Sequence, residues 1–200
     1  MPARHFTAAI AAAIVALGSP VRAEQLYVTP VMNYIVTKVM PWINDPVIIE
    51  AVKAQNLKHA NMNAQDIDKL DRQWMQEIDA PEKPLIDSVL TTPASLFLQH
   101  KQAASAGAIV EIFVMDNKGL NVAEGDATSD YWQGDEDKFQ KTYDVADDAL
   151  FIDEPEWDDE AKIWRNQVSF TLTDAAKTKI GAVTVEINLT ELQRRQSPAT

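Results

Sequence analysis

The chain has 200 residues, of which 46% are hydrophobic and 24% are charged, and its formal net charge at pH 7 is −12. Its length and composition are typical of one globular domain with a buried core, while so acidic a surface argues against nucleic acid or an anionic membrane as a partner. There is no cysteine, so packing has to stabilise the fold without disulfides.

The first residues have the features of a secretory signal peptide. Arg4-His5 is weakly basic, Phe6 to Leu17 is an apolar, alanine-rich run, and Val21-Arg22-Ala23 offers the small residues that signal peptidase prefers. A membrane anchor is the alternative, but the apolar run is shorter than the roughly 20 residues that span a bilayer. We therefore expect cleavage of residues 1–23 near Ala23 and a periplasmic or secreted product, without membrane insertion of the mature chain.

Residues 24–108 show helical patterns. Helices are expected to begin at Glu24, Asp45, Asn63 and Thr92, with a short helical or irregular piece at 85–90. Asp45-Pro46 and Thr92-Pro93 each combine an N-cap side chain with a first-turn proline, and Pro41 is expected to end the first helix. That helix carries an apolar stripe with the spacing of one helix face, which could pack in a core or pair two copies of the chain: Val28, Val31, Ile35 and Val39.

From Ile109 the pattern changes to that of strands. Five are expected, at 109–115, 120–123, 150–152, 163–172 and 180–189. The turn at 173–179 joins the last two into an antiparallel hairpin. Because helices precede a meander of strands, the sequence predicts an α+β domain with a helical region at 24–108, a sheet at 109–193 and a frayed tail at 194–200.

Three parts of the chain carry a family resemblance. They are the helical start with VIIEAVKAQN (Val47–Asn56) and DIDKLDRQW (Asp66–Trp74), the stretch IFVMDNKGLNVAEGDATSDYWQGDEDKFQKTY (Ile112–Tyr143), and the closing KIGAVTVEINL (Lys179–Leu189). In this order they resemble the Cache family of PAS-like extracellular sensor domains, also called PDC domains, over nearly all of the mature chain.

The resemblance implies a single Cache-like domain, in which a long N-terminal helix and short helices pack on a five-stranded antiparallel sheet. It places a ligand pocket between the sheet and the long connection after the second strand. Cache domains bind small molecules and report through a membrane to kinases, chemoreceptors or cyclases. The chain is therefore expected to be an exported, non-enzymatic sensor domain with a membrane sensor kinase or chemoreceptor as partner. The alternative is a structural or homodimerising module of the same fold, without a ligand.

The expected ligand-binding residues lie in and around this connection. Tyr131 and Trp132 each offer a broad apolar face with one polar group, although they could equally pack in a core. Trp132 is expected to be the most ligand-sensitive position, because Gly134 allows a bend that turns the rings inward. Asp130 and Asp135 could hold an amine or another cation, or belong to a solvated acidic loop.

Four further residues complete the expected pocket, namely Phe113, Met115, Tyr143 and Arg165. The resemblance implies an Arg before the aromatic pair in members that bind amino acids, and Ser129 stands there. Arg165 could replace that Arg if it faces the pocket, or pair with an acid on a neighbouring strand. With no Arg or Lys before Lys138 in this wall, a cationic or neutral ligand such as an amine is favoured over a dicarboxylate.

The sequence contains no motif of a catalytic or metal site. His59 and His100 are the two histidines of the mature chain, too few for a three-histidine zinc site, and there is no GxSxG motif or glycine-rich phosphate loop. The acidic run Asp153–Glu160 lacks the glycine and alternating ligands of an EF-hand and is expected to be a solvated hairpin tip. No enzyme activity, metal or cofactor is therefore expected.

Overall fold

The computed structural model describes residues 20–196 and the side chains of residues 27–196. Most of the expected signal peptide and the last four residues lie outside this range, while residues 20–23 begin the first helix. In chain order the elements are α1 (Pro20–Tyr34), η1 (Ile35–Val39), α2 (Met40–Ile43), α3 (Pro46–Lys58), α4 (Ala64–Ile78), α5 (Pro84–Leu90), α6 (Pro93–Ala104), β1 (Ile109–Met115), β2 (Asn121–Glu124), α7 (Asp137–Gln140), β3 (Leu150–Ile152), β4 (Glu156–Asp158), β5 (Ile163–Thr173), β6 (Lys179–Asn188) and α8 (Leu189–Gln196).

The strands form one antiparallel sheet in the order β2-β1-β6-β5-β3, with β4 also paired to β5. The α+β class and the five expected strands are confirmed. The sixth, β4, lies in the acidic run that the sequence alone assigns to a solvated tip. It pairs because Trp157 lies opposite Trp164 on β5, with ring centroids 5.6 Å apart, and aromatic cross-strand pairs stabilise neighbouring strands.

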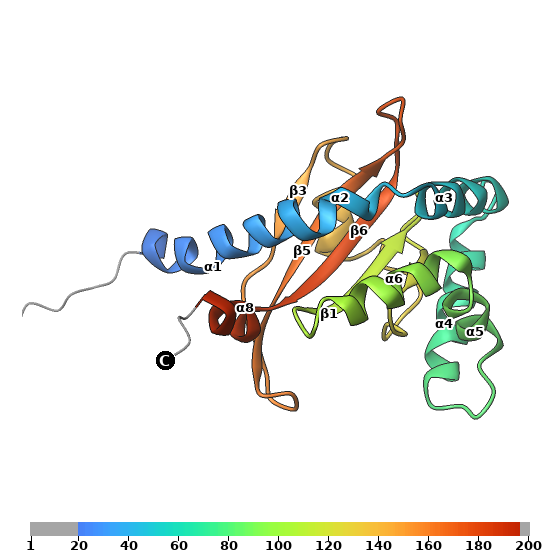
Figure 1. Ribbon diagram of the computed structural model, residues 1–200. Helices are drawn as coiled ribbons and strands as arrows, with labels where there is room; N and C mark the ends of the chain where they lie inside the picture. The colour runs from blue at the N-terminus through green and yellow to red at the C-terminus, as the bar shows by residue number, and fades with distance from the viewer. Residues whose placement is uncertain (1–19, 197–200) are drawn as a thin grey trace, which may run out of the picture.

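One face of the sheet is covered by the N-terminal helices and α6 (Figure 1). Alternate residues of the three central strands point into this core, which is the period expected of a strand with one face buried: Ile112, Val114, Val168, Phe170, Leu172, Val183, Val185 and Ile187. Opposite them Val31, Ile35 and Val39 are fully buried. The apolar stripe of the first helix therefore packs in the core of its own domain. It is not available to pair two copies of the chain.

The opposite face of the sheet is covered by the long connection between β2 and β3, which contains α7. A smaller apolar cluster lies there, made of Phe113, Met115, Phe139, Ala182 and Tyr143. Helices α4 and α5 lie at one side of the sheet (Figure 1) and enclose a third cluster around Trp74. The connection thus lies between the sheet and the α4–α5 helical pair.

Pro41 does not end the N-terminal helix, which continues to Ile43. The backbone widens just before the proline: η1 is a turn of π-helix, in which the Met40 N–H donates to the Ile35 carbonyl. A proline has no N–H to donate, and in a regular helix its ring collides with the carbonyl one turn earlier. The extra residue in the π-turn accommodates both changes.

The helix starts predicted at Asp45, Asn63 and Thr92 are confirmed by their caps, whereas the start predicted at Glu24 is wrong, because α1 already includes Pro20. The Asp45 carboxylate accepts the Val47 N–H at 3.0 Å, and Pro46 occupies the first turn of α3. Asn63 caps α4 through a reciprocal pair of bonds with Asp66. These are contacts between residues two or three apart, so local sequence is enough to predict them.

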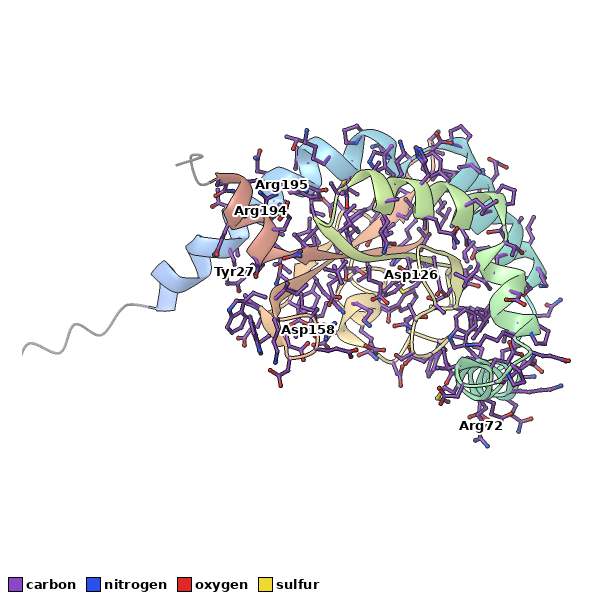
Figure 2. The ribbon with its side chains drawn as sticks, turned by 60° about the horizontal axis from the view of Figure 1, so that its bottom comes forward. Tyr27, Arg72, Asp126, Asp158, Arg194 and Arg195 are labelled. Carbon is purple, nitrogen blue, oxygen red and sulfur yellow. The ribbon has the colours of Figure 1, made fainter. Side chains whose placement is uncertain are left out.

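The last described residues, up to Gln196, are helical where the sequence predicts a frayed tail from residue 194. Leu189 and Leu192 of α8 are buried, and the Arg195 guanidinium donates to the carbonyls of Ser105 and Ala106, both at 2.8 Å. Figure 2 shows Arg194 and Arg195 on this helix, at the end of the molecule that carries α1. The expected tail is wrong for residues up to Gln196, because two leucines three residues apart have a core to pack against.

Candidate functional site

A groove of about 330 Å³ lies on the sheet face that the connection covers. We call it the sheet groove. Strands β1, β5 and β6 form its floor, and the connection with α7 forms its wall. Its lining residues are Val110, Glu111, Phe113, Asp126, Thr128, Ser129, Asp130, Gln133, Lys138, Arg165, Gln167 and Glu186.

Two carboxylates meet on the floor of the sheet groove. Glu111 on β1 lies opposite Glu186 on β6, and Glu186 lies opposite Gln167 on β5. Burial, and next the charge of Glu186, raise the pKa of Glu111 to about 7. Burial also raises the pKa of Glu186, although the Arg165 guanidinium opposes that shift. The floor therefore carries an acidic pair whose doubly charged form is disfavoured, by burial and by the charge that each carboxylate places beside the other.

The two cations of the groove are already engaged by acids. Arg165 approaches Glu156 and Asp158 at 3.6 Å each and Glu186 at 3.4 Å. Lys138 contacts Glu136 at 2.8 Å. A carboxylate ligand would have to compete with these acids for either cation.

The wall of the groove is built by internal hydrogen bonds of the connection. Gln133 donates to the Asp130 carboxylate at 2.6 Å, and the Thr128 hydroxyl donates to the Asp130 carbonyl at 2.7 Å. The Thr128 N–H donates to Glu124 at 2.9 Å. Glu124 is fully buried, its other carboxyl oxygen has no partner among the described residues, and burial raises its pKa to about 8. A neutral Glu124 side chain thus holds the connection at the end of β2.

The structure brings some of the expected ligand-binding residues together. Asp130, Phe113 and Arg165 line the sheet groove. Met115 and Tyr143 do not line it, but belong to the apolar cluster beside it, where Tyr143 stacks on Phe139 with centroids 5.1 Å apart. Asp135 is exposed and lies outside the groove.

Tyr131 and Trp132 point away from the sheet groove. The Tyr131 ring stacks on Trp74 of α4 with centroids 5.2 Å apart, and the Trp132 indole donates to the Lys118 carbonyl at 2.8 Å. Both of their backbone N–H groups donate to one oxygen of Asp71, at 3.0 and 2.9 Å. Asp71 therefore fixes this part of the connection against α4, and the rings pack among the helices instead of over the sheet.

Tyr131 lines a second pocket of about 400 Å³, which we call the helix pocket. It lies between α3, α5, the start of α6 and β2. Its lining residues are Ala51, Ala54, Gln55, Lys58, His59, Leu70, Leu85, Ser88, Val89, Thr92, Pro93, Val122 and Tyr131. Successive residues of the connection thus serve different sites, with Asp130 at the sheet groove and Tyr131 at the helix pocket.

Sequence reasoning missed Glu111, Glu186, Gln167 and Gln133 as groove residues. A signal for the first two exists, since each is a glutamate within a strand that is otherwise mostly apolar. Alternation also places Glu111 on the same face as Phe113. That Glu111 lies opposite Glu186 depends on the register of β1 against β6, which no local pattern contains.

Two further searches cover the described residues alone. Within them, no three histidine, aspartate or glutamate side chains gather as a metal ion would require. No helix in the same part of the chain combines the length and apolar character needed to cross a bilayer.

No family model matches the chain, and no curated protein matches it. Solved structures do match. The ligand-binding domain of the Pseudomonas aeruginosa PAO1 amino acid chemoreceptor PctC, in complex with GABA, is 15% identical with a TM-score of 0.37, over 78% of this chain and 63% of that one. The Vibrio cholerae histidine kinase DctB sensor domain is 13% identical with a TM-score of 0.39, over 88% and 59%. The Escherichia coli DcuS sensor domain is 14% identical with a TM-score of 0.38, over 66% and 92%.

These three solved structures are the ligand-binding domain of a chemoreceptor, the sensor domain of a histidine kinase and a third sensor domain. The chain spans 63% of the PctC domain.

Proposed function

We propose that the chain is an exported, non-enzymatic sensor domain that binds a small molecule in the sheet groove. The observation that carries this is the location of the groove, which lies between the sheet and the connection that follows its second strand. A concave site of this size with a few convergent polar groups is typical of small-molecule sites.

The ligand that the groove suits best is an amine. An ammonium group between Glu111 and Glu186 would replace the repulsion of two facing carboxylates with two favourable ion pairs. A dicarboxylate would add negative charge beside four acids of the lining, Glu111, Glu186, Asp126 and Asp130. The resemblance implies a ligand-binding Arg at the position of Ser129. Arg165 is a poor replacement for it, because Arg165 already contacts three carboxylates.

Ligand occupancy would be passed to a membrane protein. The described residues contain the sensor fold but no helix that could cross a membrane, and the matching solved structures come from chemoreceptors and histidine kinases. A membrane sensor kinase or chemoreceptor is therefore the proposed partner.

A thermal-shift screen of the purified protein tests ligand binding. The panel holds monoamines, diamines, amino acids and dicarboxylates. A ligand at 100 times its Kd stabilises the fold by about 2.7 kcal/mol, and we expect amines to produce the largest shifts. Glu111→Gln should weaken the response, whereas Glu160→Gln, an exposed glutamate outside the groove, should leave it unchanged. Stabilisation by dicarboxylates alone would refute the amine assignment, and the absence of any shift would refute ligand binding for this panel.

A further inference from the structure

The helix pocket has a buried histidine in its wall. His59, at the end of α3, is 2% exposed, and its Nδ1 lies 2.8 Å from the carboxylate of Asp116. Histidine at such a position can serve purely to satisfy a buried acid. Whether His59 has a further role depends on two things: the hydrogen bonds that Asp116 accepts, and the surroundings of the second ring nitrogen, Nε2.

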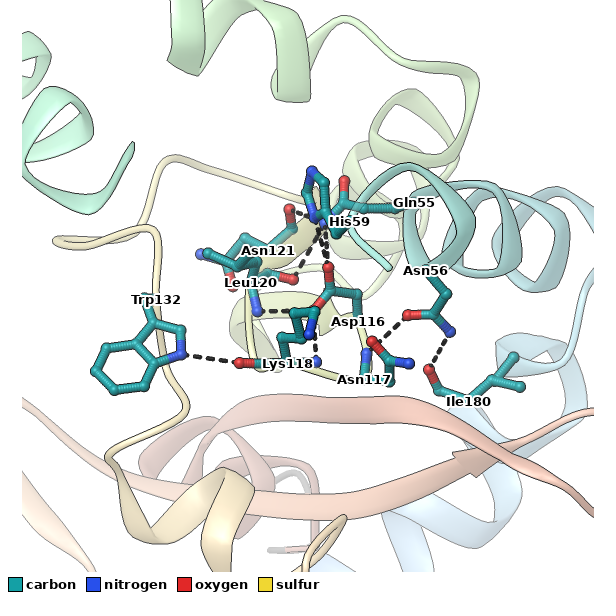
Figure 3. Close-up of polar contacts among 10 residues, drawn as sticks. All are labelled: Gln55, Asn56, His59, Asp116, Asn117, Lys118, Leu120, Asn121, Trp132 and Ile180. Carbon is teal, nitrogen blue, oxygen red and sulfur yellow. Dashed lines mark hydrogen bonds and ion pairs between the residues drawn. The ribbon is translucent and has the colours of Figure 1, made fainter. Parts of the chain in front are cut away.

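Asp116 sets the tautomer of the His59 ring. Its carboxylate is fully buried and accepts hydrogen bonds from the backbone N–H groups of Lys118 and Leu120 and from the Gln55 amide (Figure 3). A group that accepts from three donors is an ionised acceptor, so the proton in the contact with His59 resides on Nδ1. In the neutral ring, Nε2 then carries the lone pair and can accept a hydrogen bond.

Nε2 of His59 has no hydrogen-bond partner in the part of the chain that the structure describes. Figure 3 shows the ring extending away from Asp116, and His59 is part of the pocket lining. Two other polar groups of the lining are used locally: the Gln55 amide donates to Asp116, and the Thr92 side chain caps α6. Nε2 is not among the buried polar atoms without a partner, so it reaches accessible space, and there it adjoins a pocket lined largely by apolar side chains.

We infer that the helix pocket is a second binding site, for a small neutral molecule with an apolar body and one hydroxyl that donates to Nε2 of His59. Ala51, Val89 and Val122 supply apolar wall, and the ring of Tyr131 supplies an aromatic one. A phenol has this combination of a flat apolar body and a single donor. The site is separate from the sheet groove, so it stands whether or not the groove binds an amine.

The test compares p-cresol with toluene, which has the same body without the hydroxyl. Both are titrated into the ¹⁵N-labelled protein and followed by ¹H–¹⁵N NMR. We expect p-cresol to shift amides of α3, α5 and Tyr131, with an affinity at least about tenfold above that of toluene, the discrimination that one hydrogen bond of about 1.4 kcal/mol supplies. Equal binding of the two compounds, or shifts confined to the sheet groove, would overturn the inference without any variant.

Variants assign the effect to His59. His59→Asn places an amide that can still donate to Asp116 but removes Nε2, so it should bind p-cresol no better than toluene. His100→Asn, which changes the exposed histidine of α6, should retain the full preference. Val89→Phe should fill the pocket and abolish binding of both compounds. A His59→Asn protein that folds and still prefers p-cresol would also overturn the inference.

Discussion

Glu111 of β1 lies directly opposite Glu186 of β6, and both line the sheet groove on the face away from the helical core. Like charges at facing positions of neighbouring strands destabilise a sheet. Partial burial strengthens this effect, since it weakens the solvation of both carboxylates. The pair therefore makes the free protein less stable than a neutral pair would, and it makes the groove responsive both to pH and to a bound cation.

Glu111→Gln should remove a pH dependence of stability. The pKa of Glu111 is raised from 4.5 to about 7 in the folded protein, so the folded state keeps a proton that the unfolded state has lost. The stability that this proton contributes is complete below pH 4.5 and is lost as the pH rises to about 7, at up to about 1.4 kcal/mol per pH unit. Urea unfolding at pH 5, 6, 7 and 8 should therefore show the wild type losing stability relative to the variant up to about pH 7. Parallel curves would contradict this.

Glu124→Gln should show the same behaviour extended to a higher pH. Burial raises the pKa of Glu124 to about 8, so the wild type should go on losing stability relative to this variant until about pH 8, one unit beyond the plateau of Glu111→Gln. Glutamine keeps an oxygen that can accept the Thr128 N–H, which now bonds to Glu124, so the connection should stay in place. If the two variants reach their plateaus at the same pH, the assignment of the higher pKa to Glu124 is wrong.

Trp132→Ala should change stability more than it changes affinity for a groove ligand. The indole donates to the Lys118 carbonyl and packs among the helices, and it does not line the groove. Loss of this bond costs about 1 kcal/mol, in addition to the packing that is lost. Trp74→Ala, which removes a fully buried ring, should cost about 3–5 kcal/mol. Melting temperature and amine affinity are measured on both variants, and lost affinity with an unchanged melting point would restore Trp132 to the ligand site.

Gly119→Ala should destabilise the protein much more than Gly107→Ala. Both glycines have positive φ, +81° and +82°. An alanine at either position therefore lowers the free energy of unfolding by about 1 kcal/mol through backbone strain. At Gly119 the added methyl group would lie 2.6 Å from the Gly134 Cα, whereas at Gly107 it would meet nothing within 4 Å. Chemical denaturation should separate the two variants by at least about 1 kcal/mol, and equal losses would show that the close contact with Gly134 relaxes freely.

The sequence alone determined the features that depend on neighbouring residues. Asp45 and Asn63 cap their helices through groups two or three positions away, and alternation within β1 and β6 assigns Glu111 and Glu186 to one face of each strand. The π-turn before Pro41 is also local, and it lets the helix continue to Ile43, where the proline by itself predicts an end.

Only the tertiary structure decided which residues share a site. Glu111 meets Glu186 because of a strand register between residues 75 positions apart in the sequence, and Tyr131 faces the helices because Asp71, from α4, binds two consecutive backbone N–H groups of the connection. An aromatic residue gains from burial against either surface, since hydrophobic burial has no direction. The sequence of the connection therefore could not show whether Tyr131 would pack on the sheet or on the helices. The hydrogen bonds from Asp71 on α4 decided this.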